Sequence, residues 1–436
     1  MAQPSQQAGP AKLEFSVGEN GEDIGYEIET FKWMSFVNGG YIIRVVLSDP
    51  NYGILNKLTK GSVDGVGADS DKNYVKYLKE GRSTPVEVKF RLVVNDENKT
   101  NIRHAYLTNL HARGEQQSAS LEFIAIDPSS YILNAGIASG KIYKGNIAEV
   151  IKQVVTDASS EFPKPIQLAI TQTRDSKENY WPQMRLDPKT FIMYLLDISS
   201  SLTQKNSRWI VSSGTDDKGT PKLNIKEEAE LQGEHIGVYT VASNDLAARD
   251  AVDWNFEANN FISAFQTKLV TGGISATTGT YLDRITAPHK TVIEDKNTSE
   301  KVNTKTDENR AFTTPKKQWA TFIQSIPEHN AGDVGVPYSD YMNGIIRQKF
   351  VNMTAMTMRL AVKVTGDYRL DDSEKLGTST CTLQWKTHEG EDYFLSGNWI
   401  IYGFEHSLDI SEWHTVLYLY RIDHDSESKI IGPNAT

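Results

Sequence analysis

The chain has 436 residues, of which 39% are hydrophobic and 23% are charged, as is typical of a folded protein with about two to four domains. Its 56 acidic residues outnumber its 46 basic residues, and the formal net charge of −10 argues against a general affinity for nucleic acid phosphates. Cys381 is the only cysteine, which excludes an intrachain disulfide and a metal site built from several thiolates.

The N-terminal segment is polar and rich in Gln and Pro, and we expect residues 1–12 to be flexible. It lacks the charged start and the apolar core of a signal peptide. No apolar run in the chain approaches the ~20 residues that a membrane helix needs. We therefore expect a soluble protein that is made in the cytosol and has no membrane partner.

Strand patterns fill the chain from about residue 13 to residue 133. Residues 40–50 are rich in β-branched side chains and end on an Asp-Pro breaker. In residues 85–96 apolar positions alternate with charged ones, and residues 118–128 repeat this alternation, which indicates a sheet with one face in water. We predict an antiparallel sheet or small barrel here, interrupted by a Gly- and Asp-rich loop at residues 61–73.

The apolar period changes to that of a helix in residues 145–163. Apolar residues recur there at helical spacing, Asn146 can cap the start and Pro163 marks the end. A second helix is predicted where Asp187 precedes Pro188, because Asp is a favoured N-cap and Pro a favoured first helical residue.

Two short strands around a polar turn at residues 214–221 follow, so we predict a small α+β unit over residues 136–233. Strand patterns return in residues 261–285. Residues 289–318 are so polar that we expect a long loop, which orders only against a partner. A third helix is predicted over residues 338–350, and the last strands follow it.

Near the C-terminus, four possible metal ligands lie close together in sequence: Glu405, His406, Glu412 and His414. Strand alternation predicts two faces, with Ile400, Tyr402, Phe404 and His406 on one and Trp399, Ile401, Gly403 and Glu405 on the other. His406 and His414 could approach each other across a hairpin that turns at residues 409–412. Catalytic zinc usually has three protein ligands, and no HExxH motif is present. We therefore interpret the stretch as a hairpin whose histidines end its strands, with no metal site.

Two other binding motifs are incomplete. Gly136 and Gly140 are separated by three residues instead of the four of a phosphate-binding loop, and Ile rather than Ser or Thr follows Lys141. An acidic loop also lacks the Glu that would close a calcium site, and its carboxylates are Asp64, Asp69 and Asp71.

Catalytic and carbohydrate-binding hypotheses rest on scattered residues. Three carboxylates could do acid and base work in a glycosidase, but nothing places a second carboxylate opposite them. These are Asp371, Asp372 and Glu374. Exposed aromatic side chains could bind carbohydrate, although such residues more often belong to a core or an interface. The candidates are Trp181, Trp209 and Trp413.

The C-terminal block has a regular pattern of Gly, aliphatic and aromatic positions. They are Gly366, Leu395, Gly397, Trp399, Ile401, Phe404, His406, Thr415, Leu417, Leu419 and Arg421. In this pattern the block resembles the closing barrel of hub proteins from contractile phage tails, which are related to the spike-bearing proteins of type VI secretion. Trp399 stands where the family usually has Tyr, Phe404 where it has Val, and Asp371 where a glycine is often found. A second segment, residues 262–290, looks like the part that opens the second barrel, through Gly279, Tyr281 and Asp283.

The resemblance implies an α+β fold that is mainly β, with two similar antiparallel β-barrel domains, a small α+β domain and a long inserted polar loop. The implied ranges are 13–135 for a first barrel of the tube-adaptor type, 136–233 for the α+β domain, 234–290 and 350–425 for the second barrel, 291–349 for the polar loop and helix, and 426–436 for a flexible tail.

The resemblance also implies a function in the virion, as a baseplate hub without enzyme activity, cofactor or metal. Such hubs are homotrimers whose paired barrels form a pseudo-six-fold ring that joins the hexameric tail tube to the trimeric central spike. The implied partners are other copies of the chain, tail tube or tube-initiator proteins, the central spike protein and baseplate wedge proteins. The alternatives are a tail-associated polysaccharide or cell-wall hydrolase that uses the paired histidines, and a carbohydrate-binding module.

Overall fold

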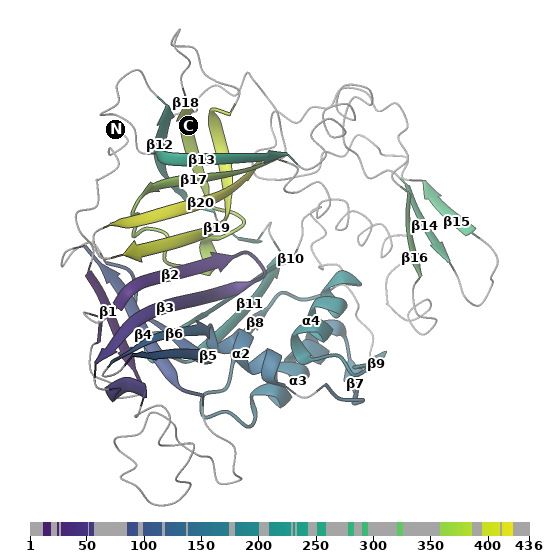
Figure 1. Ribbon diagram of the computed structural model, residues 1–436. Helices are drawn as coiled ribbons and strands as arrows, with labels where there is room; N and C mark the ends of the chain where they lie inside the picture. The colour runs from purple at the N-terminus through teal and green to yellow at the C-terminus, as the bar shows by residue number, and fades with distance from the viewer. Residues whose placement is uncertain are drawn as a thin grey trace, which may run out of the picture.

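The computed structural model describes residues 12–18, 24–25, 28–50, 52–55, 85–94, 99–115, 118–136, 138–173, 179–199, 209–227, 230–231, 233–242, 251–258, 278–282, 290–294, 321–325, 358–385, 395–409 and 412–421. Strands dominate these residues, and the helices are few (Figure 1). Residues 1–11 of the predicted flexible N-terminus, the C-terminal tail, the loop at residues 61–73 and the helix at residues 338–350 lie outside the described residues, whereas Lys12 already belongs to a strand.

Twelve strands form one sheet that runs through the molecule, and it divides into two halves of six strands (Figure 1). The first half contains β1 (Lys12–Val17), β2 (Ile28–Phe36), β3 (Gly40–Pro50), β4 (Glu87–Val93), β5 (Arg103–Glu115) and β6 (Ser118–Ile126). The second half contains β12 (His235–Ala242), β13 (Ala251–Ala258), β17 (Met358–Thr365), β18 (Thr380–Trp385), β19 (Gly397–Asp409) and β20 (Trp413–Arg421). The halves meet where β2 pairs with β19.

Both halves have the same strand order. The first runs β1-β4-β5-β6-β3-β2, and the second runs β12-β18-β19-β20-β17-β13. Counted along each half, both orders are first, fourth, fifth, sixth, third and second strand. One orientation differs, because β1 is antiparallel to β4 whereas β12 is parallel to β18. The shared order indicates that the two halves are copies of one structural unit.

Irregularities in the strand pairing also recur at matching places. The pairing of β5 with β6 shifts between Leu107 and Asn109, and that of β19 with β20 shifts between Ile401 and Gly403. The second strand of each half has a further bulge, next to Ile28 in β2 and next to Ala251 in β13. Bulges are specific features of a fold rather than random defects. Their recurrence therefore fixes which residue of one half corresponds to which residue of the other.

The inward-facing side chains of both halves form one hydrophobic core. In β4 the predicted alternation is confirmed, since Val88, Phe90 and Leu92 are buried between half-buried charged neighbours. The largest fully buried side chains include Phe15, Phe31, Trp33, Phe90, Phe123, Trp399 and Phe404. Each such side chain contributes about 2 to 3 kcal/mol when it leaves water.

The α+β unit connects the two halves. It contains α2 (Pro128–Ala135), β7 (Ile142–Gly145), α3 (Ile147–Ser159), β8 (Gln167–Ile170), β9 (Asn179–Pro182), α4 (Pro188–Asp197), β10 (Trp209–Thr215) and β11 (Pro221–Glu227). The predicted caps of both helices are confirmed, with a capping box at Asn146 and an N-cap at Asp187. The sequence prediction missed α2, although Asp127 precedes Pro128 with the same cap signal. No helix among these residues is long and apolar enough to cross a membrane.

Two features differ from the sequence prediction. Among the described strands neither half closes into a barrel, because β2 uses its outer edge to pair with β19 instead of with its own half, and β13 pairs only with β17. The segment that was expected to open the second barrel is also placed differently. Its strand β14 (Thr278–Leu282) pairs with β15 (Lys290–Glu294) and β16 (Thr321–Ser325) in a separate sheet, while β13 takes the place beside β17. Strand β15 lies in the predicted polar loop, where three of its five residues, Thr291, Val292 and Ile293, are β-branched.

Candidate functional site

The junction of the two halves is where most residues predicted from the sequence gather. β19 divides one of its edges between two partners, since residues 397–400 pair with β18 and residues 403–409 pair with β2. In the second pairing Trp33 lies opposite His406. Strand β2 of the first half therefore completes the sheet of the second half.

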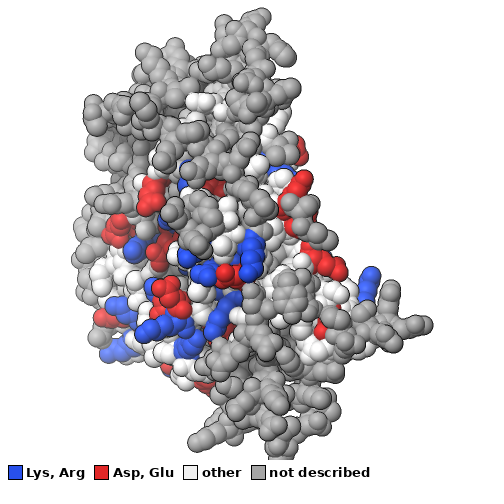
Figure 2. Space-filling model, turned by 90° about the vertical axis from the view of Figure 1, so that its left-hand side faces the viewer, with Lys and Arg blue, Asp and Glu red and all other residues white. Residues whose placement is uncertain are grey.

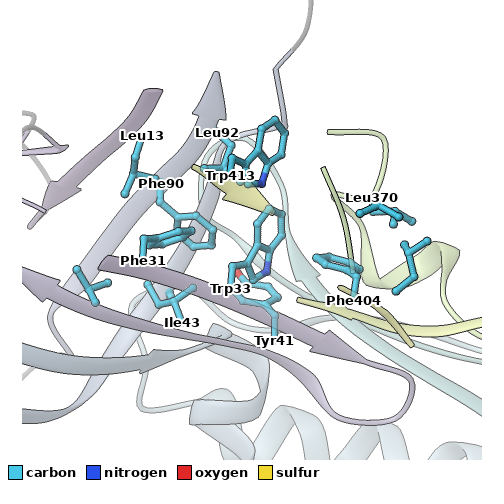
Figure 3. Close-up of a cluster of buried hydrophobic side chains, with 14 of the residues drawn as sticks. Leu13, Phe31, Trp33, Tyr41, Ile43, Phe90, Leu92, Leu370, Phe404 and Trp413 are labelled. Atoms are coloured by element: carbon cyan, nitrogen blue, oxygen red, sulfur yellow. The ribbon is translucent and has the colours of Figure 1, made fainter. Parts of the chain in front are cut away.

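Aromatic rings from both halves pack around Trp33 at this junction. Its ring centroid lies 5.3 Å from that of Phe404 and 5.2 Å from those of Phe90 and His406. Figure 3 shows Trp33, Phe90 and Phe404 in one cluster with Trp413. Aromatic pairs of this kind add about 0.5 to 1.5 kcal/mol beyond the burial of their area. The two halves cannot separate without exposing this shared core.

His406 is the buried polar residue at the centre of the junction. Its Nε2 lies 2.7 Å from the Leu370 carbonyl and donates to it, so Nδ1 accepts from the Thr415 hydroxyl at 2.9 Å. Thr415 Oγ1 accepts in turn from the backbone N–H of Asp367 at 2.8 Å. Burial lowers the pKa of His406 to about 4, although the Leu370 carbonyl and Asp367 act in the opposite direction. His406 is therefore neutral at pH 7 and links β19 to β20 and to the segment after β17.

Asp367 holds a second buried network together. Its carboxylate accepts from Arg369 Nε at 2.8 Å and from the Tyr239 hydroxyl at 2.5 Å. Burial alone raises the pKa of Asp367, but the hydrogen bonds and charge of Arg369 outweigh burial and hold this pKa below its usual range. Arg369 Nη1 also donates to the Ile236 carbonyl at 2.7 Å. The network ties β12 to the segment that follows β17.

The pattern residues of the C-terminal block lie in and around this core. Those with at most 1% of their surface exposed are Leu395, Trp399, Ile401, Phe404, His406, Thr415, Leu417 and Leu419. A Cβ on Gly366 would lie 2.0 Å from Trp413 Cδ2, so only glycine fits there. Gly397 begins β19 with a φ of 111°, a conformation that favours glycine. Arg421 ends β20.

The two histidines, which could have met across the hairpin, do not approach each other. His406 lies opposite Thr415 and His414 lies opposite Ser407, so the two rings are on opposite faces of the hairpin. His414 Nε2 lies 2.8 Å from Glu412 Oε2 on the outer face. His406 also lies inside β19 rather than at its end. In the part of the chain that the structure describes, no group of three His, Cys, Asp or Glu side chains is placed to hold a metal ion.

Strict alternation along β19 fails because of the bulge at Tyr402. The extra residue between Ile401 and Gly403 reverses the faces of the strand at this point. Trp399 and Ile401 consequently belong to the same core as Phe404, whereas alternation placed them on the opposite face.

The acidic cluster has structural contacts. Asp371 Oδ2 accepts from the backbone N–H of Asn101 at 3.1 Å and from its side-chain amide at 2.7 Å. Asp372 lies 3.5 Å from Arg103 Nη2, and Glu374 accepts from an Asn side chain of β11. These carboxylates therefore hold the second half against the first half and the α+β unit.

Three aromatic residues proposed for carbohydrate binding are not available on the surface. Trp181, Trp209 and Trp413 are only 2%, 6% and 6% exposed. Each belongs to a hydrophobic core, which contradicts a binding role through their faces.

A cavity of about 510 Å³ lies in the α+β unit, with the rings of Tyr131, Tyr143 and Phe162 in its wall. Lys141, from the incomplete phosphate loop, also lines it, but its ammonium group pairs with Asp157. Asp157 accepts from the Tyr143 hydroxyl as well, at 3.1 Å. Lys141 and Asp157 therefore have partners within the protein at this cavity.

A further polar cluster lies where the first half meets the α+β unit, and sequence reasoning missed it. Glu87 Oε1 lies 2.6 Å from His104 Nδ1 and 3.2 Å from Lys164 Nζ. Burial alone raises the pKa of Glu87, but His104 and Lys164 outweigh it and lower this pKa. No local pattern could have joined these residues, because the contacts cross from β4 to β5 and to the α+β unit.

Charged side chains on the outer face of the main sheet are paired across strands. Lys32 Nζ lies 3.2 Å from Glu405 Oε1, and Arg44 Nη2 lies 2.6 Å from Glu122 Oε1. Figure 2 shows basic and acidic side chains interspersed on one face of the molecule. Among the described residues on this face, neither sign of charge gathers into a patch of its own.

Comparison with known proteins yields matches in structure only. No family model and no curated protein matches the sequence. The tail protein from Neisseria meningitidis MC58 shares the fold at 9% identity with a TM-score of 0.51, over 94% of this chain and 97% of that chain. The 43 kDa tail protein of prophage MuSo2 from Shewanella oneidensis shares the fold at 9% identity with a TM-score of 0.51, over 95% of this chain and 99% of that chain. A chain of the lidded Francisella PdpA-VgrG complex matches at 10% identity with a TM-score of 0.50, over 95% of this chain and 53% of that chain.

Proposed function

We propose that this chain is a structural baseplate hub of a contractile phage tail. The observation that carries the proposal is the duplication, in which one chain holds two six-stranded units of the same strand order that are joined edge to edge. The similarity of the fold to two tail proteins supports the proposed location in a phage tail.

The duplication suits a ring that matches two symmetries. Three chains with two equivalent halves each supply six similar units, so a homotrimer can face a hexameric tube on one side and a trimeric spike on the other. In this ring the halves act as the two barrels of the hub, completed by neighbouring chains. The partners are the tail tube or tube-initiator proteins, the central spike and the baseplate wedges.

The role requires complementary surfaces and no chemistry at a catalytic centre. The buried networks of His406 and Asp367 supply rigidity at the junction of the halves. The hydrolase alternative loses its proposed site, because His406 and His414 lie on opposite faces.

Electron cryomicroscopy of intact tails that contain this chain tests the proposal. We expect three copies at the end of the tube, in contact with the spike. The chain in another part of the particle, or in a number other than three at this position, would contradict it.

A further inference from the structure

Part of strand β5 is exposed in a way that its counterpart in the second half is not. β5 pairs with β4 only through residues 103–106, and along residues 108–115 its edge on that side has no strand partner among the described residues. Most side chains from Thr108 to Gly114 are exposed. The counterpart segment, residues 403–409 of β19, is buried or half-buried as far as Leu408 because β2 pairs with it.

Strand β13 has the complementary feature. It is the counterpart of β2, it ends the strand order of the second half, and it pairs only with β17 among the described strands. Trp254 of β13 is 48% exposed, whereas the corresponding Phe31 of β2 is fully buried. A Trp so exposed, on a strand whose outer edge has no partner among the described strands, is typical of an interface rather than of a free surface.

We propose that β13 of one copy pairs with residues 108–115 of β5 in the next copy, and so repeats between chains the junction that β2 and β19 form within a chain. The partner is thus a second copy of this chain. The inference rests on the proposed ring and adds the strands and the register that build it.

The correspondence between the halves fixes the register of this contact. The bulges align Thr30 to Ser35 of β2 with Asp253 to Ala258 of β13, and Phe404 to Asp409 of β19 with Leu110 to Glu115 of β5. Transfer of the β2–β19 pairs gives Asp253 with Glu115, Trp254 with Gly114, Asn255 with Arg113, Phe256 with Ala112, Glu257 with His111, and Ala258 with Leu110.

Two of the pairs at this register favour the contact, whereas Asp253 opposite Glu115 brings two acidic residues together and weakens it. Trp254 comes to lie opposite Gly114, where a Cβ would lie 3.3 Å from the Tyr52 hydroxyl, so the indole ring would pack beside the ring of Tyr52. Asn255 comes to lie opposite Arg113, whose guanidinium group can donate to the amide oxygen. Both are exposed in the single chain, so pairing displaces no existing strand among the described residues.

The contact is head to tail and can close. Among the described strands each chain has one β13 edge and one β5 edge without a strand partner, and a contact between different surfaces forms a ring when its rotation closes. Since the contact copies the junction inside the chain, every half in a ring of three chains has the same kind of neighbour.

Disulfide trapping tests this register. In the double variant Asn255→Cys with Arg113→Cys, the paired positions lie within the ~4.4 to 6.8 Å Cα distance that a disulfide needs. We expect oxidation to link chains into dimers and trimers, and no larger species, on a denaturing gel. The variant Lys32→Cys with Ser407→Cys is the matched control, because it places the same pair at the junction within one chain.

A shifted pair provides the second control. Asn255→Cys with Asn109→Cys moves one partner four residues along β5, about 14 Å away, and should link chains about ten-fold less. All variants keep Cys381, which is fully buried, and the single variants show whether it takes part.

The outcomes separate the two proposals when native mass is measured on the same samples. Trimers without the expected crosslink, or with equal crosslinking of the shifted pair, overturn this register and leave the hub role standing. Crosslinked species of more than three chains would contradict the closed ring of three chains. A chain that stays monomeric at high concentration and forms no crosslink contradicts both.

Discussion

At the scale of single residues, the junction depends on polar groups that the fold keeps away from water. His406 donates to the Leu370 carbonyl, accepts from Thr415 and packs against Trp33. Asp367 is satisfied by Arg369. Buried polar groups are costly when they lose a partner, so these residues should be sensitive to pH and to substitution.

The first prediction concerns the pH dependence of stability. The pKa of His406 is about 4 in the folded chain and about 6.5 in the unfolded chain, so the unfolded state binds the proton first as pH falls. The contribution of His406 is complete above pH 6.5 and is lost as pH falls to 4. When the pH is lowered from 7 to 4, we expect the free energy of unfolding to decrease by about 3 kcal/mol more in wild type than in His406→Gln. Urea unfolding between pH 7 and pH 4 measures this difference, and equal slopes would contradict it.

The second prediction concerns the network of Asp367. Asp367→Ala leaves Arg369 and Tyr239 without their shared partner, and we expect a loss of about 3 kcal/mol in the free energy of unfolding. Glu412→Ala is the control, because this carboxylate is on the surface and its loss should cost less than about 0.5 kcal/mol. Chemical denaturation at pH 7 compares the two variants. Equal stability of both would show that the network contributes little.

At the scale of elements, the sequence predicted best where the signal was local. The hairpin of β19 and β20, the alternation in β4 and the caps at Asn146 and Asp187 all follow from short patterns. The bulge at Tyr402 could not be predicted, because the composition of the strand does not reveal it. This one added residue moves every preceding side chain of β19 to the other face of the sheet.

The third prediction tests a close contact between elements. In Gly366→Ala the new Cβ would meet the Trp413 ring, and we expect a loss of about 1 to 3 kcal/mol in the free energy of unfolding. A Cβ at Gly140 would meet no atom within 4 Å, so Gly140→Ala serves as the matched control and should be neutral within about 0.5 kcal/mol. Thermal unfolding of both variants decides, and a stable Gly366→Ala protein would contradict the packing described for the hairpin.

At the scale of the whole molecule, the chain is a duplication joined by strand pairing. The sequence did not reveal this clearly, because corresponding positions share burial and register more than residue type, as Trp399 in β19 and Ala105 in β5 illustrate. Whether each half closes into a barrel could not be predicted either. An edge strand can pair with its own unit or with another unit, and only the tertiary fold decides between them. The candidate site was likewise found in parts, since its histidine was recognised and its partners across the sheet were not.

The native mass of the purified protein tests the central claim most directly. The chain has a mass of 48.8 kDa, and native mass spectrometry should find three times this value as the main species at physiological salt. A single-chain mass at all concentrations, or a main species with a number of chains other than three, would contradict the account.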